Sequence, residues 1–309
     1  MNASAYSFRL GDVAGWKGHL ADQGFAVIRG LISPATCTLR TLEMQDVLRR
    51  LSRGALTEDP ATWARAKNYP FLLHGGMNQY VGHAPFQWAS REDMAPVFEE
   101  YWQTSALSSS FDGFCYMDGR RTFRPRSILS FVHTDQSPHT DGVGSIQGLL
   151  NFGASGPDAG GLVVVPGSHR IQRDFFVKRG LLPRLDPKNN WYLFSEEEKQ
   201  DPAFAGAMVV EGQPGDAMIW DSRLFHCNTV PSAPSVRAVA YVCMIPRGHV
   251  PIDVREKRRL AFRQRRCTAH HPGDGFRVFP KLPRFAAVDY EDVLAVQTPM
   301  LSARMAALV

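Results

Sequence analysis

Residues 127–141 read SILSFVHTDQSPHTD, and this stretch decides the fold and the chemistry that the sequence predicts. Its apolar residues at 128, 129, 131 and 132 favour β-structure, so we expect a largely buried strand over 127–133. Residues i and i+2 of a strand point to the same side. His133 and Asp135 are therefore expected to face one point together.

A third candidate ligand lies in PGDAMIWDSRLFHCNTV, residues 214–230, where His226 follows a short apolar strand predicted over 217–220. Two imidazoles and one carboxylate make the set that holds non-haem Fe(II) on one face and leaves the opposite positions open. The next β-rich run, VRAVAYVCM, carries Arg237. A buried guanidinium needs an anionic partner, and a dicarboxylate ligand would supply one.

The pattern H-x-D, then His, then Arg, with GGLVVVPGSHR at 160–170 between them, resembles the phytanoyl-CoA dioxygenase family of Fe(II)- and 2-oxoglutarate-dependent dioxygenases. The resemblance runs from about Gly24, in GFAVIRGLIS, to the strand after Arg237. It implies a mainly β fold with flanking helices, a double-stranded β-helix of the jelly-roll, cupin-like kind. It also implies Fe(II), 2-oxoglutarate and O₂, and leaves ascorbate open as a reductant.

The resemblance assigns roles to particular residues. His133, Asp135 and His226 would be the catalytic metal ligands, and Arg237 would bind the distal carboxylate of 2-oxoglutarate in a bidentate pair. His169, in PGSHR, recurs in the family without being a ligand, and we interpret it as structural.

The sequence contains two H-T-D triplets, and only one can supply the iron pair. His133 and Asp135 end a predicted strand and open H-x-D-Q-S-P, the motif that the resemblance implies for the metal pair. His139 and Asp141 lie in a flexible turn before Gly142 and remain the alternative; their other expected role is to line the mouth beside the substrate. Related halogenases have Ala or Gly in place of the carboxylate, so either pair favours hydroxylation.

The predicted strand SIQGLLNF, residues 145–152, adds another candidate. Gln147, Leu149 and Asn151 share one face, and two amides on one face suggest that it points into the cup. Gln147 is thus a candidate contact of co-substrate or substrate, and the alternative is a hydrogen-bonding role within the fold.

At 309 residues the chain is expected to be one domain, 1–309, with a β-helix core at about 111–247, a helical N-terminal extension and a basic C-terminal extension. Ser33 and Pro34 predict the start of a helix that continues to Leu51, and a second helix is expected over 92–107. The long polar segment 171–202 and residues 72–88 are candidate substrate-selecting loops. The remaining predicted strands are 25–29, 113–117, 161–165, 207–210 and 237–245.

Composition bounds the cellular setting and the partners. Five widely spread cysteines argue for a reducing compartment, and no signal peptide or membrane span is recognisable, so we expect a cytoplasmic protein without a membrane partner. The net charge of +5 and pI of about 9.0 allow an anionic small-molecule substrate. The basic run at 255–266 is typical of a solvated helix face, with an anion-binding rim or a structural contact as alternatives. We do not expect a nucleic-acid partner.

These observations predict an oxygenase that hydroxylates a C–H bond of a small-molecule metabolite, in natural-product biosynthesis or catabolism, as it converts 2-oxoglutarate to succinate and CO₂. Two alternatives stay open: the same chemistry on a macromolecule, and a non-catalytic jelly-roll binding protein. The substrate, the choice between hydroxylation and desaturation, and the oligomeric state are not encoded in any recognisable motif.

Overall fold

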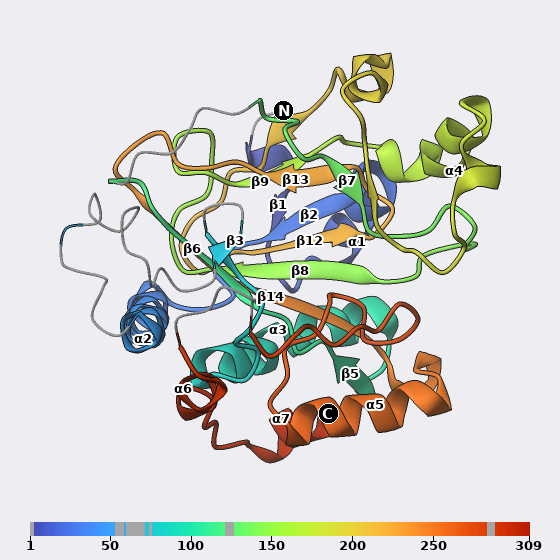
Figure 1. Cartoon of the computed structure of the whole chain (residues 1–309). Coiled ribbons are helices and arrows are strands. Elements are labelled where there is room, and N and C mark those ends of the chain that lie inside the picture. The colour runs from blue at the N-terminus through green and yellow to red at the C-terminus, as the bar shows by residue number, and fades with distance from the viewer. Residues whose placement is uncertain (1–2, 53–58, 60–71, 74–75, 121–126, 283–287) are drawn as a thin grey trace.

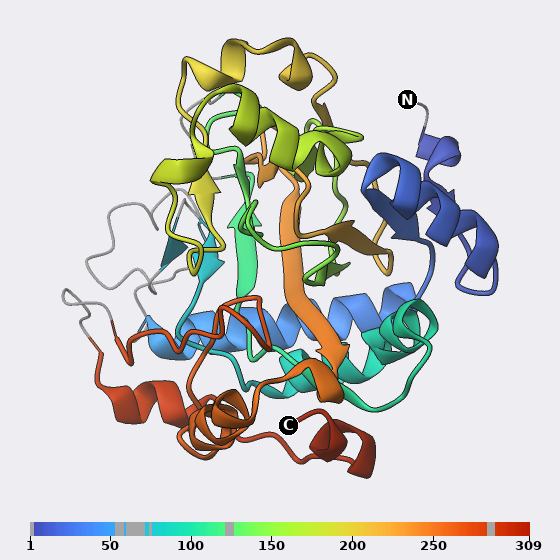
Figure 2. The ribbon, with the colours of Figure 1, turned by 90° about the vertical axis from the view of Figure 1, so that its right-hand side faces the viewer.

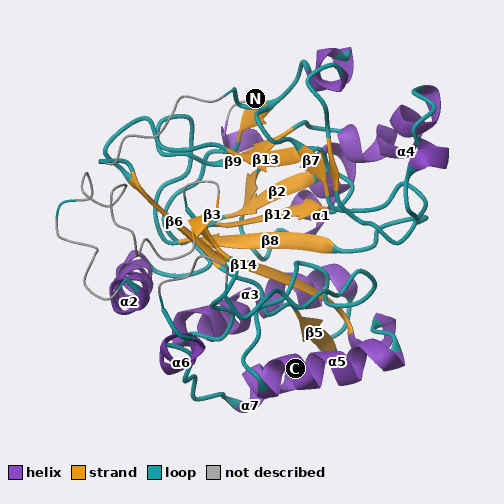
Figure 3. Cartoon of the chain, viewed as in Figure 1, coloured by secondary structure: helices purple, strands orange, loops and turns teal. Residues whose placement is uncertain are grey.

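The computed structural model describes residues 3–52, 59, 72–73, 76–120, 127–282 and 288–309. Within these residues the strands form two sheets that face each other (Figures 1 and 3). The large sheet has the order β1 (Ser7–Phe8), β2 (Phe25–Ile28), β12 (Ala217–Asp221), β8 (Ile146–Asn151), β14 (Val236–Pro246), β6 (Phe114–Asp118), β4 (Met77–Asn78) and β3 (Leu72–Leu73), with β5 (Leu107–Ser109) paired to β14. The small sheet has the order β10 (Tyr192–Leu193), β7 (His133–Thr134), β13 (His226–Asn228), β9 (Leu162–Val164) and β11 (Met208–Val209).

The fold is therefore mainly β with flanking helices, of the jelly-roll type that the sequence predicted. The two sheets remain separate open layers and do not close into a barrel. Strand pairing is antiparallel at the centre of both sheets, and the pairing of β1 with β2 is parallel.

Helices cover the outer face of the large sheet, while the small sheet covers its inner face (Figures 1 and 2). The α-helices are α1 (Val13–Gln23), α2 (Pro34–Leu51), α3 (Pro85–Trp102), α4 (Ser168–Lys178), α5 (Ile252–Arg263), α6 (Tyr290–Ala295) and α7 (Ala303–Ala307). Short 3₁₀ helices are η1 (Ala3–Ala5), η3 (Leu182–Arg184), η4 (Glu198–Gln200), η5 (Pro202–Phe204) and η6 (Arg247–His249). The predicted start of α2 is confirmed, because the Ser33 hydroxyl accepts from the Thr36 amide and Pro34 occupies the first helical position.

The alternation of side chains along β14 separates two cores. Ala238, Ala240 and Val242 pack outward with the helices, whereas Val239 and Tyr241 point inward toward the small sheet. Arg237 has the same parity as Tyr241 and so lies on the inner face as well. This strand therefore carries a guanidinium and a phenol into the space between the sheets.

Three predicted elements are wrong in their extent. Residues 127–132 form turns, with the Ser130 amide bonded to the Ser127 carbonyl, and the strand is reduced to His133–Thr134. Its apolar residues pack individually instead of as a strand, and Ile128 is 41% exposed. The helix expected over 92–107 is α3, which begins seven residues earlier and ends at Trp102. The segment 171–202 is not all loop, because α4 extends to Lys178.

The cysteines and the apolar character of the helices were also considered in the sequence analysis. All five cysteines are free and buried, which agrees with the absence of a disulfide framework. Among the described residues, none of the helices combines the length and apolar character needed to cross a membrane.

Candidate metal centre

His133 and His226 lie directly opposite each other on neighbouring antiparallel strands of the small sheet, β7 and β13. Opposed residues on such strands have close side chains, and these two imidazole rings are 4.4 Å apart between centroids. Asp135 follows β7 immediately, and its Oδ2 lies 3.6 Å from His133 Nε2 and 3.3 Å from His226 Nε2. The three ligand atoms lie within 4.8 Å of one another. The structure thus brings together the three residues that the sequence predicted.

Each histidine of this triad is held in the tautomer that a metal requires. The Nδ1 atom of His133 lies 2.9 Å from the Phe131 carbonyl oxygen, and that of His226 lies 2.8 Å from the Leu224 carbonyl oxygen. A carbonyl oxygen only accepts hydrogen bonds, so both Nδ1 atoms carry the proton. The Nε2 lone pairs are therefore free and directed toward Asp135, the arrangement in which imidazole binds a metal.

The protonation states also suit a cation. Burial disfavours an ionised Asp135, but the neighbouring His133 and His226 outweigh it and hold the pKa of this carboxyl well below its usual range. Burial lowers the pKa of His226, and His133 lowers it further. A carboxylate and a neutral imidazole are the forms that coordinate a metal ion.

The carboxylate of Asp135 is fixed from several sides. The Gln147 side-chain amide donates to Asp135 Oδ2 over 3.0 Å. The backbone amide of Asp135 donates to the Ser222 carbonyl. His271 Nε2 donates to the Asp135 carbonyl oxygen over 2.6 Å. Such outer contacts orient a ligand and tune its affinity for the metal. Gln147 thus contacts a candidate metal ligand, and its contact with co-substrate or substrate remains a prediction.

Arg237 is fully buried on the inner face of β14. Its Nη2 donates to Asn228 Oδ1 over 2.6 Å, but Nε and Nη1 have no hydrogen-bond partner among the described residues. Asn228 lies two residues after His226 on β13, so the guanidinium is tied to the strand that carries a candidate ligand. A buried guanidinium with two free donors is costly unless an anion completes it.

In the part of the chain that the structure describes, three other buried polar atoms on the inner faces also have no protein partner: Gln147 Oε1, Tyr241 Oη and Trp220 Nε1. The Trp220 ring lies 5.4 Å from the ring of His226, and Arg237 is near enough to Tyr241 to oppose the pKa increase that burial causes. Unpaired donors and acceptors of this kind match an oxygen-rich ligand between the sheets. The donor set therefore fits Fe(II) together with a dicarboxylate.

The second H-T-D triplet lies outside the triad. His139 Nε2 bonds to the Leu182 carbonyl over 3.1 Å, and the Asp141 side chain is 96% exposed and pairs with Arg173. Neither belongs to the cluster of possible metal ligands, which among the described residues consists of the His133 triad. His169 is also separate, because its Nε2 bonds to the Ala21 carbonyl.

The structure adds neighbours that our sequence analysis missed. His270 and His271 come from the C-terminal region, where AHHPG had offered the signal of two adjacent histidines before a Pro-Gly turn. His271 touches Asp135, and the ring of His270 lies 5.9 Å from that of Tyr241. Trp191, 6.2 Å from His133 between ring centroids, comes from the segment predicted to select substrate.

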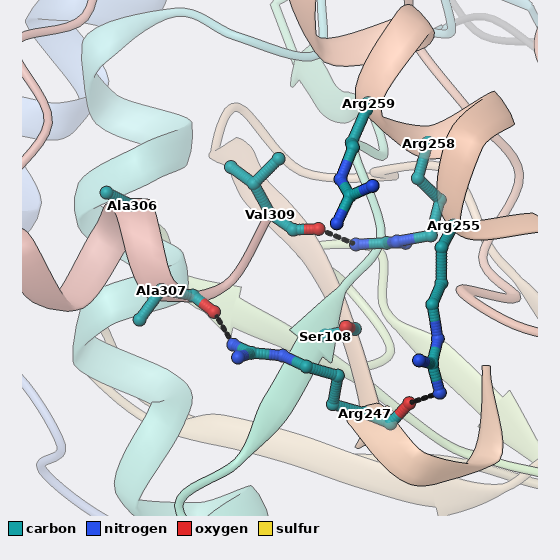
Figure 4. Close-up of a pocket in the computed structure, with 8 residues that line it drawn as sticks. All are labelled: Ser108, Arg247, Arg255, Arg258, Arg259, Ala306, Ala307 and Val309. Carbon is teal, nitrogen blue, oxygen red and sulfur yellow. Dashed lines mark hydrogen bonds between the residues drawn. The ribbon is translucent and has the colours of Figure 1, made fainter. Parts of the chain in front are cut away.

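The basic run at 255–266 has mixed roles. Lys257 and Arg259 are exposed and pair with acidic residues on their own helix, α5. Arg258 is buried and donates to backbone carbonyls, including those of Ser109 and Pro272. A hollow of about 270 Å³ lies beside it, and three of the arginines that line the hollow, Arg247, Arg255 and Arg258, donate to backbone carbonyl oxygens (Figure 4). The triad does not line this hollow.

Comparisons with known proteins agree with this geometry. The family model described as phytanoyl-CoA dioxygenase (PhyH) matches residues 20–228. A protein of Aspergillus versicolor named Ava biosynthesis cluster protein O is 27% identical over 267 residues, which cover 83% of this chain and 85% of that protein.

Two solved structures share the fold. A hypothetical protein of Escherichia coli aligns with a TM-score of 0.64 at 15% identity, covering 98% of this chain and 84% of the other. A protein of Salmonella typhimurium LT2 aligns with a TM-score of 0.62 at 14% identity, covering 98% and 85%.

Proposed function

This chain belongs to the phytanoyl-CoA dioxygenase family, and from that premise we propose that it hydroxylates a C–H bond of a small organic metabolite. Members of the family are 2-oxoglutarate-dependent dioxygenases, so the enzyme is an oxidoreductase that uses Fe(II) and 2-oxoglutarate. O₂ is the oxidant that such a reaction requires.

One observation carries the proposal: three ligand atoms, from His133, Asp135 and His226, converge with both imidazoles locked in the metal-binding tautomer. All three protein ligands lie on the small sheet or directly after one of its strands. These residues would hold a cation through two imidazoles and one carboxylate, a donor set that leaves coordination positions for other ligands. Fe(II) bound in this way supplies O₂ activation coupled to the decarboxylation of 2-oxoglutarate to succinate and CO₂.

The chain's own residues bind and orient the co-substrate. The free Nε and Nη1 donors of Arg237 suit a carboxylate, which they would hold in a bidentate pair. Asn228 fixes the guanidinium from the other side, so little rotamer freedom is lost on binding. Gln147 keeps the Asp135 carboxylate oriented and offers its unpaired Oε1 to a donor group of the substrate or to water.

A small-molecule substrate is supported by two observations. The Aspergillus versicolor relative is named as a protein of a biosynthesis cluster, which fits a role in natural-product biosynthesis. Two exposed cations of α5, Lys257 and Arg259, are paired with acids of the same helix, which weakens the case for a polyanionic partner. This chain has Asp135 at the position where related halogenases have Ala or Gly, which supports hydroxylation over halogenation.

The two H-T-D triplets provide the test and its matched control. In anaerobic protein with Fe(II) and 2-oxoglutarate, we expect a weak visible charge-transfer band that is lost in His133→Ala and Asp135→Asn. The band should persist in His139→Ala and Asp141→Asn. In air, succinate formation should fall at least about 100-fold in the first pair of variants and stay near wild type in the second.

Loss of the band in the His139 and Asp141 variants, with the first pair unaffected, would move the site to the second triplet. Absence of any band in the wild-type protein, with no Fe(II)-dependent succinate from a metabolite panel, would favour the non-catalytic binding protein. Retention on nucleic acid that survives physiological salt would favour a macromolecular substrate.

A further inference from the structure

A loop from the C-terminal region reaches the candidate metal centre, although the family match ends at residue 228. This segment, residues 267–279, is here called the His–His loop; it follows α5 and lies beside β14 in Figure 1. Its two histidines are adjacent, and each contacts a different part of the centre. His271 donates to the Asp135 carbonyl, and His270 packs edge-on against the ring of Tyr241.

The His–His loop is held firmly in place. The two ends of the loop are hydrogen-bonded to each other. The Phe279 amide donates to the Cys267 carbonyl, and the Ala269 amide donates to the Arg277 carbonyl. Thr268 exchanges two hydrogen bonds with the backbone of Phe111, one from each partner's amide, at 2.9 Å each. A side chain on such an anchored loop is presented in a defined position.

Two further side chains fix the tip of the loop. The buried Arg258 donates to the Pro272 carbonyl over 3.3 Å. Asn190 Oδ1 accepts from the Ser137 amide, while its Nδ2 lies 3.5 Å from the Asp274 carbonyl. Asn190 therefore joins the loop to Ser137, two residues after the candidate ligand Asp135. Three segments distant in the chain meet beside Asp135.

His270 is held by a buried carboxylate. Its Nδ1 bonds to Asp112 Oδ2, and Asp112 Oδ1 accepts the Gly113 amide, so the acid is fixed in place. Although burial opposes the charge, Asp112 raises the pKa of His270 to about 9. Within the described residues Nε2 of His270 has no bonded acceptor, and the side chain remains 26% exposed. The result is a cation with one free N–H at the edge of the site.

Two separate cationic donors thus lie near the candidate metal centre, one on β14 and one on the His–His loop. Arg237, tied to Asn228 on β13, suits the distal carboxylate of 2-oxoglutarate. His270 stands beside Tyr241, four residues further along β14, and close enough to Asp135 for the two charges to interact. One dicarboxylate that already binds the metal and Arg237 leaves the second donor unused. His270 is therefore available to bind a second anionic group.

We propose that His270 binds a carboxylate or comparable anionic oxygen group of the organic substrate, and that Asp112 is the positioning residue that orients it. The proposal rests on the proposed oxygenase function, because it places the substrate beside the metal centre. It makes the His–His loop, and not the strands of the small sheet, the source of selectivity for an acidic substrate.

The test uses anaerobic full-length protein with Fe(II) and 2-oxoglutarate and four probe pairs: acetate, hexanoate, benzoate and phenylacetate, each beside its amide. Binding is followed through the change in the charge-transfer band. In the wild type we expect at least one carboxylate to bind about tenfold or more tightly than its amide. His270→Gln should bring that ratio close to one and leave the Kd of 2-oxoglutarate unchanged. His249→Gln, an exposed histidine of η6, is the matched control.

A wild-type protein that does not favour any carboxylate over its amide overturns the proposal, as does a His270→Gln protein that keeps the preference. A rise in the Kd of 2-oxoglutarate in His270→Gln overturns it too, since His270 would then serve the co-substrate. If the wild type shows no charge-transfer band, the oxygenase proposal itself fails, which separates the two results.

A second measurement covers the case in which His270→Gln does not fold. In the wild-type protein with Zn(II) replacing Fe(II) and ¹⁵N-labelled histidine, the His270 ring signals should shift with the preferred carboxylate and not with its amide. Asp112→Asn should reduce the carboxylate preference without changing the Kd of 2-oxoglutarate. Ring signals that stay unmoved at saturating carboxylate contradict the proposal.

Discussion

At the scale of single residues, the candidate metal centre depends on groups that are not themselves candidate ligands but hold the ligands in position. The Phe131 and Leu224 carbonyls set the tautomers of His133 and His226, and both come from residues two positions before the histidine they hold. Local chain geometry therefore prepares the nitrogen ligands. The carboxylate ligand depends instead on a distant residue, Gln147.

Replacing Gln147 with Leu tests that dependence. The change removes the amide that holds Asp135 Oδ2, so the carboxylate can rotate away from the metal. We expect Fe(II) affinity to fall by about 10- to 100-fold. Anaerobic Fe(II) titration measures it, and Asn151→Leu, a second buried amide on the same face of β8, should leave the affinity near wild type. Equal losses in both variants would indicate a general packing defect.

Arg237→Lys keeps the positive charge and removes the forked donor pair. Because lysine cannot form a bidentate pair with a carboxylate, the Kd of 2-oxoglutarate should rise at least about tenfold. Titration of the charge-transfer band measures it. Arg223, which already pairs with Asp221 inside the protein, offers a control, since Arg223→Lys should leave the Kd unchanged. An unaltered Kd in Arg237→Lys would remove this residue from the co-substrate site.

At the scale of elements, Gly24 lies between α1 and β2 and has a left-handed conformation with φ of 83°. A Cβ there would lie 2.5 Å from His169 Nδ1 and 2.6 Å from Leu224 Cδ1. At Gly30, with φ of 62°, no atom of the described residues beyond its chain neighbours lies within 4 Å of where a Cβ would be. The two glycines therefore separate backbone strain from steric conflict.

Gly30→Ala should cost only the strain of a left-handed alanine, about 1 kcal/mol. Gly24→Ala adds the clash and should lower the free energy of unfolding by about 2 kcal/mol more. Urea denaturation measures both. Because the Leu224 carbonyl holds His226, Gly24→Ala should also bind Fe(II) more weakly. Equal destabilisation of the two variants would show that the interface of α1, His169 and Leu224 yields to the extra methyl group.

At the scale of the whole molecule, the ion pair of Asp112 and His270 joins the segment between β5 and β6 to the C-terminal region. Asp112 and Asp135 favour the charged imidazole, while burial and Arg277 oppose it, and the net pKa is raised from 6.5 to about 9. A raised pKa means stability that is fully present below the unfolded value and is lost as pH rises through the folded one.

The free energy of unfolding of the wild type, relative to His270→Asn, should therefore be largest at about pH 6 and decline as the pH rises through about 9. Urea denaturation at several pH values within that window measures the difference. A difference that is constant from pH 6 to pH 10, or that grows with pH, would show that the folded pKa is not raised.

How much the sequence could predict differs between elements. The strand at 25–28 and the start of α2 follow from neighbouring residues: an apolar β-favouring run, and Ser33 with Pro34. The strand expected over 127–133 failed because its residues form turns, in which Leu129, Phe131 and Val132 pack against other parts of the chain. Apolar composition reports burial, and it does not report backbone conformation.

The amino-acid sequence by itself determined the chemical groups of this protein: two imidazoles and a carboxylate at recognisable spacing, and an arginine inside an apolar strand. These signals are local, so they are readable without coordinates. Only the tertiary structure decided which H-T-D triplet joins His226, because that choice depends on the register of β7 against β13. It alone also brought Gln147, Asp112 and the His–His loop to the centre, since such contacts arise from packing between segments far apart in the chain.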